Sequence, residues 1–335
     1  MPTVRGNGPR PPEGISRLLR PLKPLYERLP LALRRHRLYR RNFGVWGNFR
    51  NPSNYNEKLQ WRIINDRRTW LGVTSDKLAS KEYARRVAES TGLPIKVPET
   101  YWVGTDVREL RALSSQLPDR WVFKPNHSCG RYRLYDTSDE PVDWEELIAI
   151  GDLWLKPDEE ETSLGHFGYS LARKLLIVEQ RIGDVGSDPA TCRSHGSNGQ
   201  VVDHWGTIGS HPNKVAFLCD AEFEPLDPFV LWAASPDDIR SPHQRLGTEE
   251  RRQLNEMVVA LTSGFDFLRV NYYLDRGFWF AEYSPYSSSG LIDFGPQIDR
   301  IWSEAWTLPN VAAPDPRESL WRELLDRRER GTMQV

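Results

Sequence analysis

The chain has 335 residues and is poor in cysteine, with only Cys129, Cys192 and Cys219 and no CxxC pair. This spacing excludes a disulfide-stapled scaffold and gives no support to a zinc module. No apolar run approaches roughly 18 residues, so the sequence offers no membrane-spanning segment. The first residues also lack the apolar stretch of a secretory signal. We therefore expect a globular protein of the reducing cytoplasm.

The short motifs of several common enzyme classes are missing as well. There is no GxxxxGK[ST] loop and no GxGxxG after a predicted strand, so P-loop and Rossmann nucleotide sites lack support. HExxH and GxSxG are absent, which removes the usual signatures of zinc proteases and α/β-hydrolases. No DxD triplet is present, which disfavours a metal-dependent glycosyltransferase.

The sequence is rich in aromatic residues and uneven in charge. Aromatic residues make up 11% of the chain, including 13 Trp, which is too many for a disordered protein. Residues 1–50 hold 12 Lys or Arg but only 2 Asp or Glu. For the basic segment 1–42 three interpretations stay open: attachment to an anionic membrane at its inner face, docking of its leucines on the parent domain, or binding of RNA. Nucleic acid is the least favoured of these partners.

The hydrophobic periodicity predicts helices first and hairpins mixed with helices afterwards. Residues 51–119 are mostly helical in pattern, and one helix is expected to end at Gly92. Residues 174–183 form the most apolar predicted strand and should lie inside a sheet. Asn198-Gly199 is a strong hairpin signal, and residues 267–284 predict a second hairpin. This order of elements predicts an α+β fold.

Two of these segments carry groups suited to binding a nucleotide. The strand with Lys124 runs into the small-residue loop Ser128-Cys129-Gly130, and such a loop closes over phosphates while an ammonium neutralises their charge. The most apolar strand ends in Glu179-Gln180-Arg181-Ile182, whose edge offers an adenine ring a backbone donor and acceptor over an apolar floor. Taken singly, each feature is more often structural.

The second predicted hairpin places polar side chains on one face. Arg269 and Asn271 alternate on one strand, so their side chains share a face of the sheet. Glu282 and Ser284 alternate in the same way on the adjoining strand. Oxygen ligands from two paired strands suit Mg²⁺, which takes one or two carboxylates together with phosphate oxygens and water.

In their order along the chain these features resemble the ATP-grasp superfamily. The most similar branch is the TupA-like group, which is linked to teichuronopeptide and cell-surface polysaccharide biosynthesis. The matching segments lie between about residues 40 and 295 and so cover most of the chain. They are NPSNYNEKLQW, SDKLASKEYARR, LPDRWVFKPNH, LLIVEQRIG, SNGQV, FLRVNYY and FWFAEYS.

The resemblance implies a ligase that holds ATP between two α+β subdomains. It implies activation of a carboxylate as an acyl phosphate, which an amine then attacks to form an amide. The catalytic residues implied are Arg269, which stabilises the developing oxyanion, and Arg193. The residues implied to bind ATP are Lys77, Lys124, Ser128, Gly130, Glu179, Gln180 and Ile182, with Asp184 or Asp188 at the ribose. Those implied to bind Mg²⁺ are Glu282, Asn271 and Ser284.

Three departures from the family pattern bear on activity. The glycine loop reads Ser128-Cys129-Gly130-Arg131 where a GSGG-like run is usual, Asn271 replaces a metal carboxylate, and Arg193 replaces a lysine. One hypothesis is an active ligase in cell-surface polymer or specialised-metabolite biosynthesis. A second is a catalytically weakened protein that binds nucleotide or acts as a scaffold in glycopolymer assembly. A third is a glycosyltransferase, a label sometimes attached to this family.

We expect the chain to divide into four segments. The basic and partly disordered residues 1–42 come first, followed by a helical or α+β N-terminal subdomain over 43–118. The ATP-grasp nucleotide-binding and catalytic subdomains occupy 119–310, and a C-terminal helix and tail occupy 311–335. The expected partners are a carboxylate substrate and an amine substrate.

Overall fold

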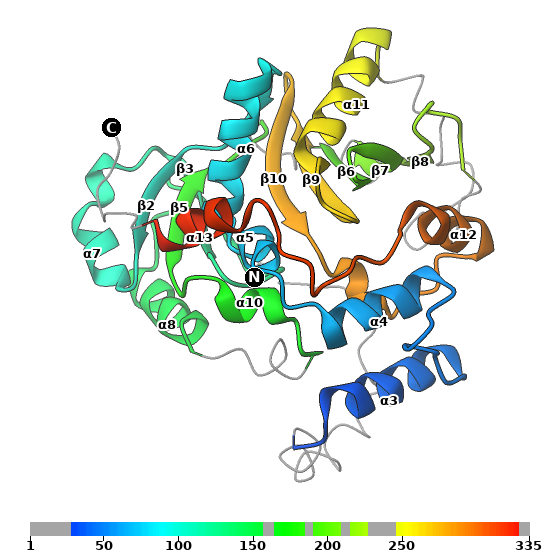
Figure 1. Cartoon of the computed structure of the whole chain (residues 1–335). Helices are drawn as coiled ribbons and strands as arrows, with labels where there is room; N and C mark the ends of the chain where they lie inside the picture. Colours follow the sequence, from blue (N-terminus) through cyan, green and yellow to red (C-terminus); the bar gives the residue numbers. More distant parts are fainter. Residues whose placement is uncertain (1–27, 157–163, 185–189, 209–214, 227–245, 328–335) are drawn as a thin grey trace.

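Two β-sheets, each with its own helices, make up the fold (Figure 1). The computed structural model describes residues 28–156, 164–184, 190–208, 215–226 and 246–327. Asp188 and residues 1–27 of the basic segment lie outside this part of the chain. The two sheet-and-helix units confirm the predicted α+β class.

Four helices open the described chain: α3 (Leu31–Phe43), α4 (Tyr55–Asn65), α5 (Trp70–Ser75) and α6 (Lys77–Thr91). The Asn54 side chain caps α4 by accepting a hydrogen bond from the Glu57 N–H, and Asp76 caps α6 by accepting one from the Ala79 N–H. Gly92 ends α6 in the left-handed conformation, with φ of 70°. The predicted helix end at Gly92 is confirmed.

The smaller sheet has four antiparallel strands in the order β2-β5-β3-β4. They are β2 (Thr100–Gly104), β3 (Arg120–Pro125), β4 (Arg133–Asp136) and β5 (Leu176–Gln180). Helices α7 (Val107–Ala112) and α8 (Trp144–Trp154) cover one face, where Trp121, Phe123 and Val178 are buried. Strand β5 lies between β2 and β3, so its predicted interior position is confirmed.

The larger sheet has six strands in the order β1-β10-β9-β6-β7-β8. They are β1 (Ile95–Lys96), β6 (Ala190–Ser197), β7 (Gln200–Ile208), β8 (Val215–Cys219), β9 (Leu268–Leu274) and β10 (Phe278–Ser284). Among the described strands only β1 pairs in parallel, with β10. Asn198-Gly199 turns β6 into β7, and β9 and β10 form the second hairpin, so both hairpin predictions are confirmed.

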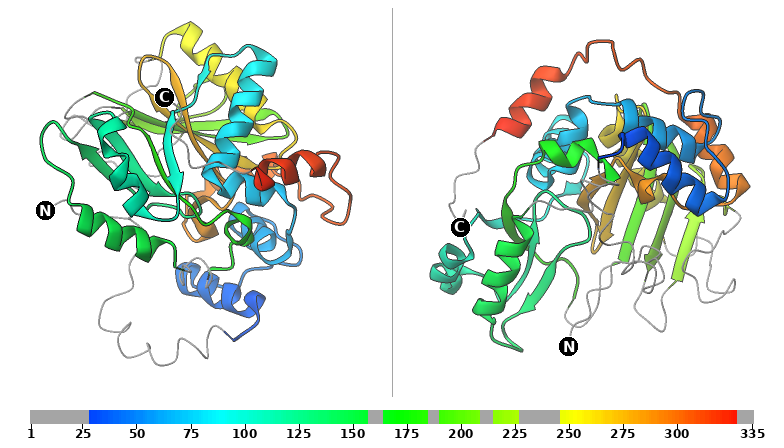
Figure 2. Two further views of the ribbon diagram at one scale, coloured as in Figure 1. Left: turned by 90° about the vertical axis from the view of Figure 1, so that its left-hand side faces the viewer. Right: turned by 90° about the horizontal axis from the view of Figure 1, so that it is seen from below.

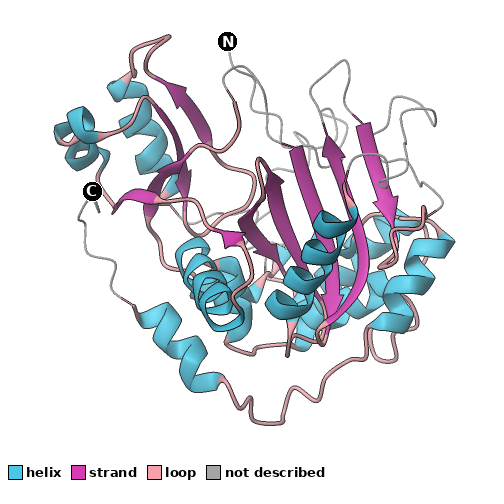
Figure 3. Ribbon diagram, turned by 90° about the horizontal axis from the view of Figure 1, so that it is seen from above, coloured by secondary structure: helices cyan, strands magenta, loops and turns pink. Residues whose placement is uncertain are grey.

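Helices enclose the larger sheet on one face and join the two units. Helix α11 (Thr248–Thr262) lies across β6, β7 and β9, as Figure 3 shows from above. Helices α5 and α6 pack beside β10, between the two sheets. Helices α4, α5 and α6 share one apolar core with this sheet. The first described helices are therefore part of the larger unit.

The last elements wrap the outside of the molecule. A short 3₁₀ turn, η5 (Ser287–Gly290), follows β10, and α12 (Pro296–Ala305) packs near α4 and β7. Helix α13 (Glu318–Asp326) returns across the molecule to α5 and α6, as the view from below in Figure 2 shows. None of the described helices has the length and apolar character needed to cross a membrane.

Candidate active site

One face of the larger sheet carries the polar residues predicted from the second hairpin. Arg269, Asn271 and Tyr273 alternate along β9, while the residues between them face the core. A β-bulge at Ala281 then shifts the register of β10, so that Glu282 lies opposite Asn271. Without the extra residue, Ala281 would take that place and Glu282 would point to the other face. The bulge therefore decides that the carboxylate joins the site.

Asn271 and Glu282 form the part of the site that fits a cation. The Asn271 amide Nδ2 donates to Glu282 Oε1 at 3.1 Å, which leaves its amide oxygen facing away from that bond. Asn271 Oδ1 is buried and has no hydrogen-bond partner among the described residues. A buried carbonyl oxygen without a donor is unfavourable unless a ligand satisfies it, and an amide oxygen beside a carboxylate is a set that Mg²⁺ accepts.

Ser284, which the resemblance implies as a metal ligand, lies beside Arg269 and Asn271. Its hydroxyl oxygen accepts hydrogen bonds from the Arg269 guanidinium at 2.9 Å and from Asn271 Nδ2 at 3.3 Å. Ser284 therefore links Arg269 to Asn271, and its role as a metal ligand stays a prediction. The described residues also contain no group of three or more His, Cys, Asp or Glu that could hold a metal.

Arg193 and Arg269 come from neighbouring strands and share an aromatic surface. Arg193 on β6 is the direct pairing partner of Asn271 on β9. The guanidinium carbon of Arg193 lies 4.9 Å from the centre of the Trp205 ring, and that of Arg269 lies 5.7 Å from it. The Arg193 guanidinium has no hydrogen bond or ion pair within the part of the chain that the structure describes. Burial, together with the charge of Arg269, lowers the pKa of Arg193 to about 10. An anion bound here would relieve this repulsion.

Three lysines come from α6 and from the smaller sheet. Lys77 and Lys81 lie one turn apart on α6, and Lys124 extends from β3. Lys81 and Lys124 both form ion pairs with the buried carboxylate of Glu179. Lys77 donates to the carbonyl of Ser128, and its Nζ lies 4.0 Å from Glu282 Oε2 of the larger sheet. Lys77 therefore connects the loop Ser128-Cys129-Gly130, which is predicted to bind phosphates, to the Asn271–Glu282 pair, which fits a cation.

The protonation of this cluster follows from two ammonium groups sharing one carboxylate. Burial opposes the charge of Lys124, but attraction to Glu179 prevails and raises the pKa of Lys124. Burial lowers the pKa of Lys81 to about 8. Attraction to Glu179 raises this pKa, but the charge of the neighbouring Lys124 lowers it again. The two lysines outweigh the burial of Glu179 and lower the pKa of its carboxyl group. Glu179 is therefore ionised at neutral pH.

The role implied for the end of β5, a backbone donor and acceptor for adenine, stays a prediction. The Glu179 side chain binds the two lysines, and the residue pairs with Thr100 on one side and Val122 on the other. The Gln180 N–H donates to the Glu99 carbonyl at 2.9 Å. The chain leaves the sheet only after Gln180, at Arg181 and Ile182.

Three further residues implied to bind ATP are Ser128, Gly130 and Asp184. Ser128 is buried, whereas Gly130 is exposed and adopts a φ of 71°, with open space where a Cβ would stand. Asp184 is exposed and pairs with Arg276 of the β9–β10 turn at 3.1 Å, so it bridges the two units at the surface. The ribose role implied for Asp184 is untested and stays a prediction.

Several residues that position the lysines were missed from the sequence. The Asn126 side chain accepts a hydrogen bond from the Leu78 N–H at 2.9 Å and donates to Asp76 at 2.7 Å. Arg173 forms an ion pair with the same carboxylate at 2.8 Å. These bonds fix the first turn of α6 against the end of β3. Lys81 was missed too, although its position four residues after Lys77 puts both on one helix face.

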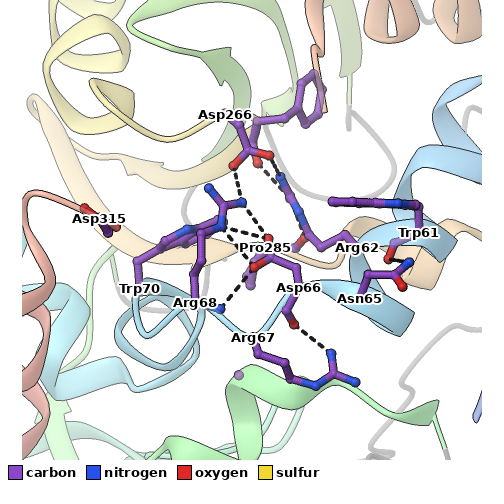
Figure 4. A network of polar contacts seen from close by, with 12 residues as sticks. Trp61, Arg62, Asn65, Asp66, Arg67, Arg68, Trp70, Asp266, Pro285 and Asp315 are labelled. Carbon is purple, nitrogen blue, oxygen red and sulfur yellow. Dashed lines mark hydrogen bonds and ion pairs between the residues drawn. The ribbon is translucent and has the colours of Figure 1, made fainter. Parts of the chain in front are cut away.

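A buried ion-pair network supports the far end of the hairpin. Arg62 and Arg68 both point at Asp266, as Figure 4 shows, at distances of 2.7 and 3.0 Å. Arg62 also donates to the carbonyls of Phe267 and Pro285, at 2.8 and 3.1 Å. These carbonyls lie just before β9 and just after β10. The network therefore holds the two strands that carry the site at their common end.

The comparisons with known proteins find similarity only among solved structures. No protein-family model matches the chain, and no curated protein matches it. Similar structures include D-alanine–D-alanine ligase from Bacillus anthracis complexed with ATP (13% identity, TM-score 0.35, 64% of this chain and 55% of that chain). A second is D-alanine–D-alanine ligase from Helicobacter pylori (13% identity, TM-score 0.37, 70% of this chain and 58% of that chain). A third is the ATP-grasp ligase PsnB complexed with a minimal precursor (9% identity, TM-score 0.33, 64% of this chain and 54% of that chain).

The chain matches little more than half the length of these three structures. At identities of 9 to 13% and TM-scores of 0.33 to 0.37 the similarities carry no argument about activity. The function below therefore rests on the geometry of the site.

Proposed function

We propose that the chain is an ATP-dependent ligase of the ATP-grasp type, which joins a carboxylate to an amine through an acyl phosphate. One observation carries the proposal. The ammonium of Lys77 on α6 lies 4.0 Å from the Glu282 carboxylate of the larger sheet, and the charge of Glu282 also acts on Lys124 of the smaller sheet. Groups that neutralise phosphates thus meet groups that bind a divalent cation.

The charges of the site suit a polyanion. The residues described above include five cations, Lys77, Lys81, Lys124, Arg193 and Arg269, but only two carboxylates, Glu179 and Glu282. A nucleoside triphosphate would supply the missing negative charge. Catalysis of phosphoryl transfer consists mainly of positioning and charge stabilisation, which such a set provides.

In the proposed reaction the substrate carboxylate attacks the terminal phosphorus of ATP. The bond from that phosphorus to the bridging oxygen breaks, and ADP leaves with the bond's electron pair. The amine then attacks the carbonyl carbon of the acyl phosphate, loses a proton, and expels inorganic phosphate. Arg269 and Arg193, which lie together over the Trp205 ring, would bind the oxygens that gain charge in both steps.

Asn271 Oδ1 and the Glu282 carboxylate would hold Mg²⁺ together with phosphate oxygens and water. A bound Mg²⁺ would neutralise phosphate charge and align the terminal phosphate. Since Asn271 contributes no formal charge, the protein's share of the metal affinity rests on one carboxylate. This is the observation that favours the second candidate, a nucleotide-binding or scaffold protein with little turnover.

The proposal is tested by calorimetry of ATP binding with and without Mg²⁺. We expect the wild-type protein to bind ATP with Mg²⁺ and Lys124→Ala to lose at least about tenfold in affinity, since a charge-assisted contact contributes about 1.5–3 kcal/mol. Lys156→Ala, a change at an exposed lysine, is the matched control. Absence of ATP binding to the wild-type protein would refute the proposal.

Asn271→Asp separates the two candidates. Restoring a carboxylate should raise the Mg²⁺ dependence of ATP affinity in both cases. A ligase weakened at this position should also consume ATP faster in the variant, whereas a scaffold should not consume ATP at all. Asn271→Asp also removes the hydrogen bond that Asn271 donates to Glu282. Asn271→Ala is the control, because it removes the same bond but supplies neither an oxygen ligand nor a charge.

We also propose that the basic N-terminal region attaches the enzyme to an anionic bilayer at its inner face, where lipid-linked cell-surface polymers are built. Leu33, Val45 and Trp46 expose 43, 60 and 56% of their surface, and Arg40 lies over Trp46 at 4.7 Å. Between residues 28 and 56 there is no Asp or Glu. Exposed aromatic and basic side chains together are typical of a membrane-surface site.

Vesicle sedimentation tests this attachment. We expect Trp46→Ser to weaken binding to vesicles containing phosphatidylglycerol, with no binding to pure phosphatidylcholine vesicles. Leu153→Ser, at another exposed apolar residue, is the control. Equal sedimentation of both variants, or binding of RNA in place of vesicles, would refute the membrane proposal.

A further inference from the structure

Two serines after β10 adopt a backbone conformation that residues with a Cβ avoid. Ser288 has φ of 50° and ψ of 22°, and Ser289 has φ of 57° and ψ of 13°. Gly290 follows with φ of 61°, so the chain is left-handed for three residues of which only the last is glycine. Such conformations persist where surrounding contacts enforce them, and they cluster at functional sites.

The contacts that enforce this turn come from two N-terminal helices and from His166. Arg35 of α3 is fully buried, and its guanidinium donates to the Ser289 carbonyl at 2.6 Å and to the Ser289 hydroxyl at 3.3 Å. It also donates to Gln60 Oε1 at 2.6 Å, and Gln60 in turn donates to the carbonyls of Ser289 and Gly290 at 3.1 and 2.8 Å. His166 shares a hydrogen bond of 2.8 Å with the Ser289 hydroxyl.

The same turn holds the guanidinium of Arg269. Ser287, the residue before the left-handed pair, accepts a hydrogen bond from one terminal nitrogen of Arg269 at 2.8 Å. Ser284 accepts from the other at 2.9 Å. A continuous series of contacts therefore runs from Arg35 on α3 through Ser289 and Ser287 to Arg269.

We propose that Arg35 is a positioning residue for Arg269, acting through the left-handed turn Ser287–Gly290. The inference rests on the proposed role of Arg269 at the reacting oxygens. The planar guanidinium of Arg35 reaches Gln60 and both polar atoms of Ser289 at once, which the single ammonium of a lysine does not reproduce. When the turn is released, Ser287 moves and Arg269 loses one of its two hydroxyl partners.

Chemical labelling of Arg269 with phenylglyoxal, followed by peptide mass mapping, reports the position of its guanidinium without any substrate. Loss of one hydrogen bond shifts an equilibrium by roughly three- to tenfold, so we expect Arg35→Lys to label at Arg269 faster by about that factor. Arg41→Lys, at an exposed position on the same helix, should label like the wild type. ATP affinity should be unchanged in both variants, because Lys77 and Lys124 have no contact with this turn.

A double-mutant cycle distinguishes positioning from plain packing. Ser287→Ala should also speed labelling of Arg269, and adding Arg35→Lys to it should change little, because the connection is already broken. Ser288→Gly relieves the left-handed backbone without removing any of these bonds, and it should label like the wild type. Unchanged labelling in Arg35→Lys, even with a lowered melting temperature, would overturn the inference. Failure of the wild type to bind ATP would instead refute the proposed function. The labelling result could still be interpreted, because the labelling requires no substrate.

Discussion

Glu179 is the carboxylate on which the lysine cluster depends, and Glu179→Gln tests that dependence. The substitution keeps the shape of the side chain but leaves the buried ammonium groups of Lys81 and Lys124 without their counter-charge. Removing one partner of a buried ion pair costs about 3–5 kcal/mol. Lys81 contributes little to this cost, because it can lose its proton once Glu179 is replaced. With a pKa of about 8, its deprotonation at pH 7 costs only about 1 kcal/mol. Most of the loss therefore comes from Lys124, whose pKa is raised.

Urea unfolding followed by tryptophan fluorescence measures the effect. We expect the free energy of unfolding to fall by about 3–5 kcal/mol at pH 7, with an unchanged slope against urea. At pH 9 the wild-type Lys81 is mostly neutral, so Glu179 then stabilises one charge instead of two, and the penalty should shrink by about 1 kcal/mol. Glu145→Gln, at an exposed carboxylate paired with Arg111 at 3.0 Å, should cost less than about 1 kcal/mol at both pH values. A penalty no larger than that of the control, or one that does not change with pH, would refute the account of the cluster.

Three further predictions concern the same framework. ATP affinity should fall between pH 7 and 9, because Lys81 loses its charge as the pH rises through about 8; calorimetry of Lys81→Met should show the weaker affinity already at pH 7 and little further change. Asp266→Asn should cost about 3–5 kcal/mol at pH 7 in urea unfolding and less as the solution is acidified. The two arginines outweigh burial and lower the pKa of Asp266, so its contribution is present above the unfolded pKa and is lost as the pH falls. Gly168→Ala should lower stability by about 1–3 kcal/mol, since a Cβ there would overlap the Leu71 carbonyl; no loss in a melting experiment would contradict the close packing of α10 (Phe167–Leu171) on α5.

Local signals predicted much of the secondary structure and part of the site. The stop at Gly92 defined the end of α6, because it acts through the backbone of its own helix. Asn198-Gly199 fixed the β6–β7 turn for the same local reason. Alternation along β9 was enough to place Arg269 and Asn271 on one face, because successive side chains of a strand point to opposite sides of its sheet.

The partners of these residues did not follow from the sequence, because they come from distant segments. The ion pairs of Glu179 join β5 to α6 and β3, and its partner Lys81 lies 98 positions before it in the chain. The hydroxyl of Ser284 accepts hydrogen bonds from both Arg269 and Asn271, which the alternation along each strand does not reveal. No periodicity in a single segment encodes such pairings.

The sequence by itself determined the α+β class, the end of α6 at Gly92 and the two hairpins, since propensity, helix stops and turns act over a few residues. Only the tertiary structure decided which groups meet. The bulge at Ala281 turns Glu282 toward Asn271, and the buried guanidinium of Arg35 enforces a backbone conformation at Ser289 that a serine would not adopt alone. The contact of Arg35 with Ser289 joins residues 254 positions apart in the chain, where the energy of many contacts overrides the preference of one residue.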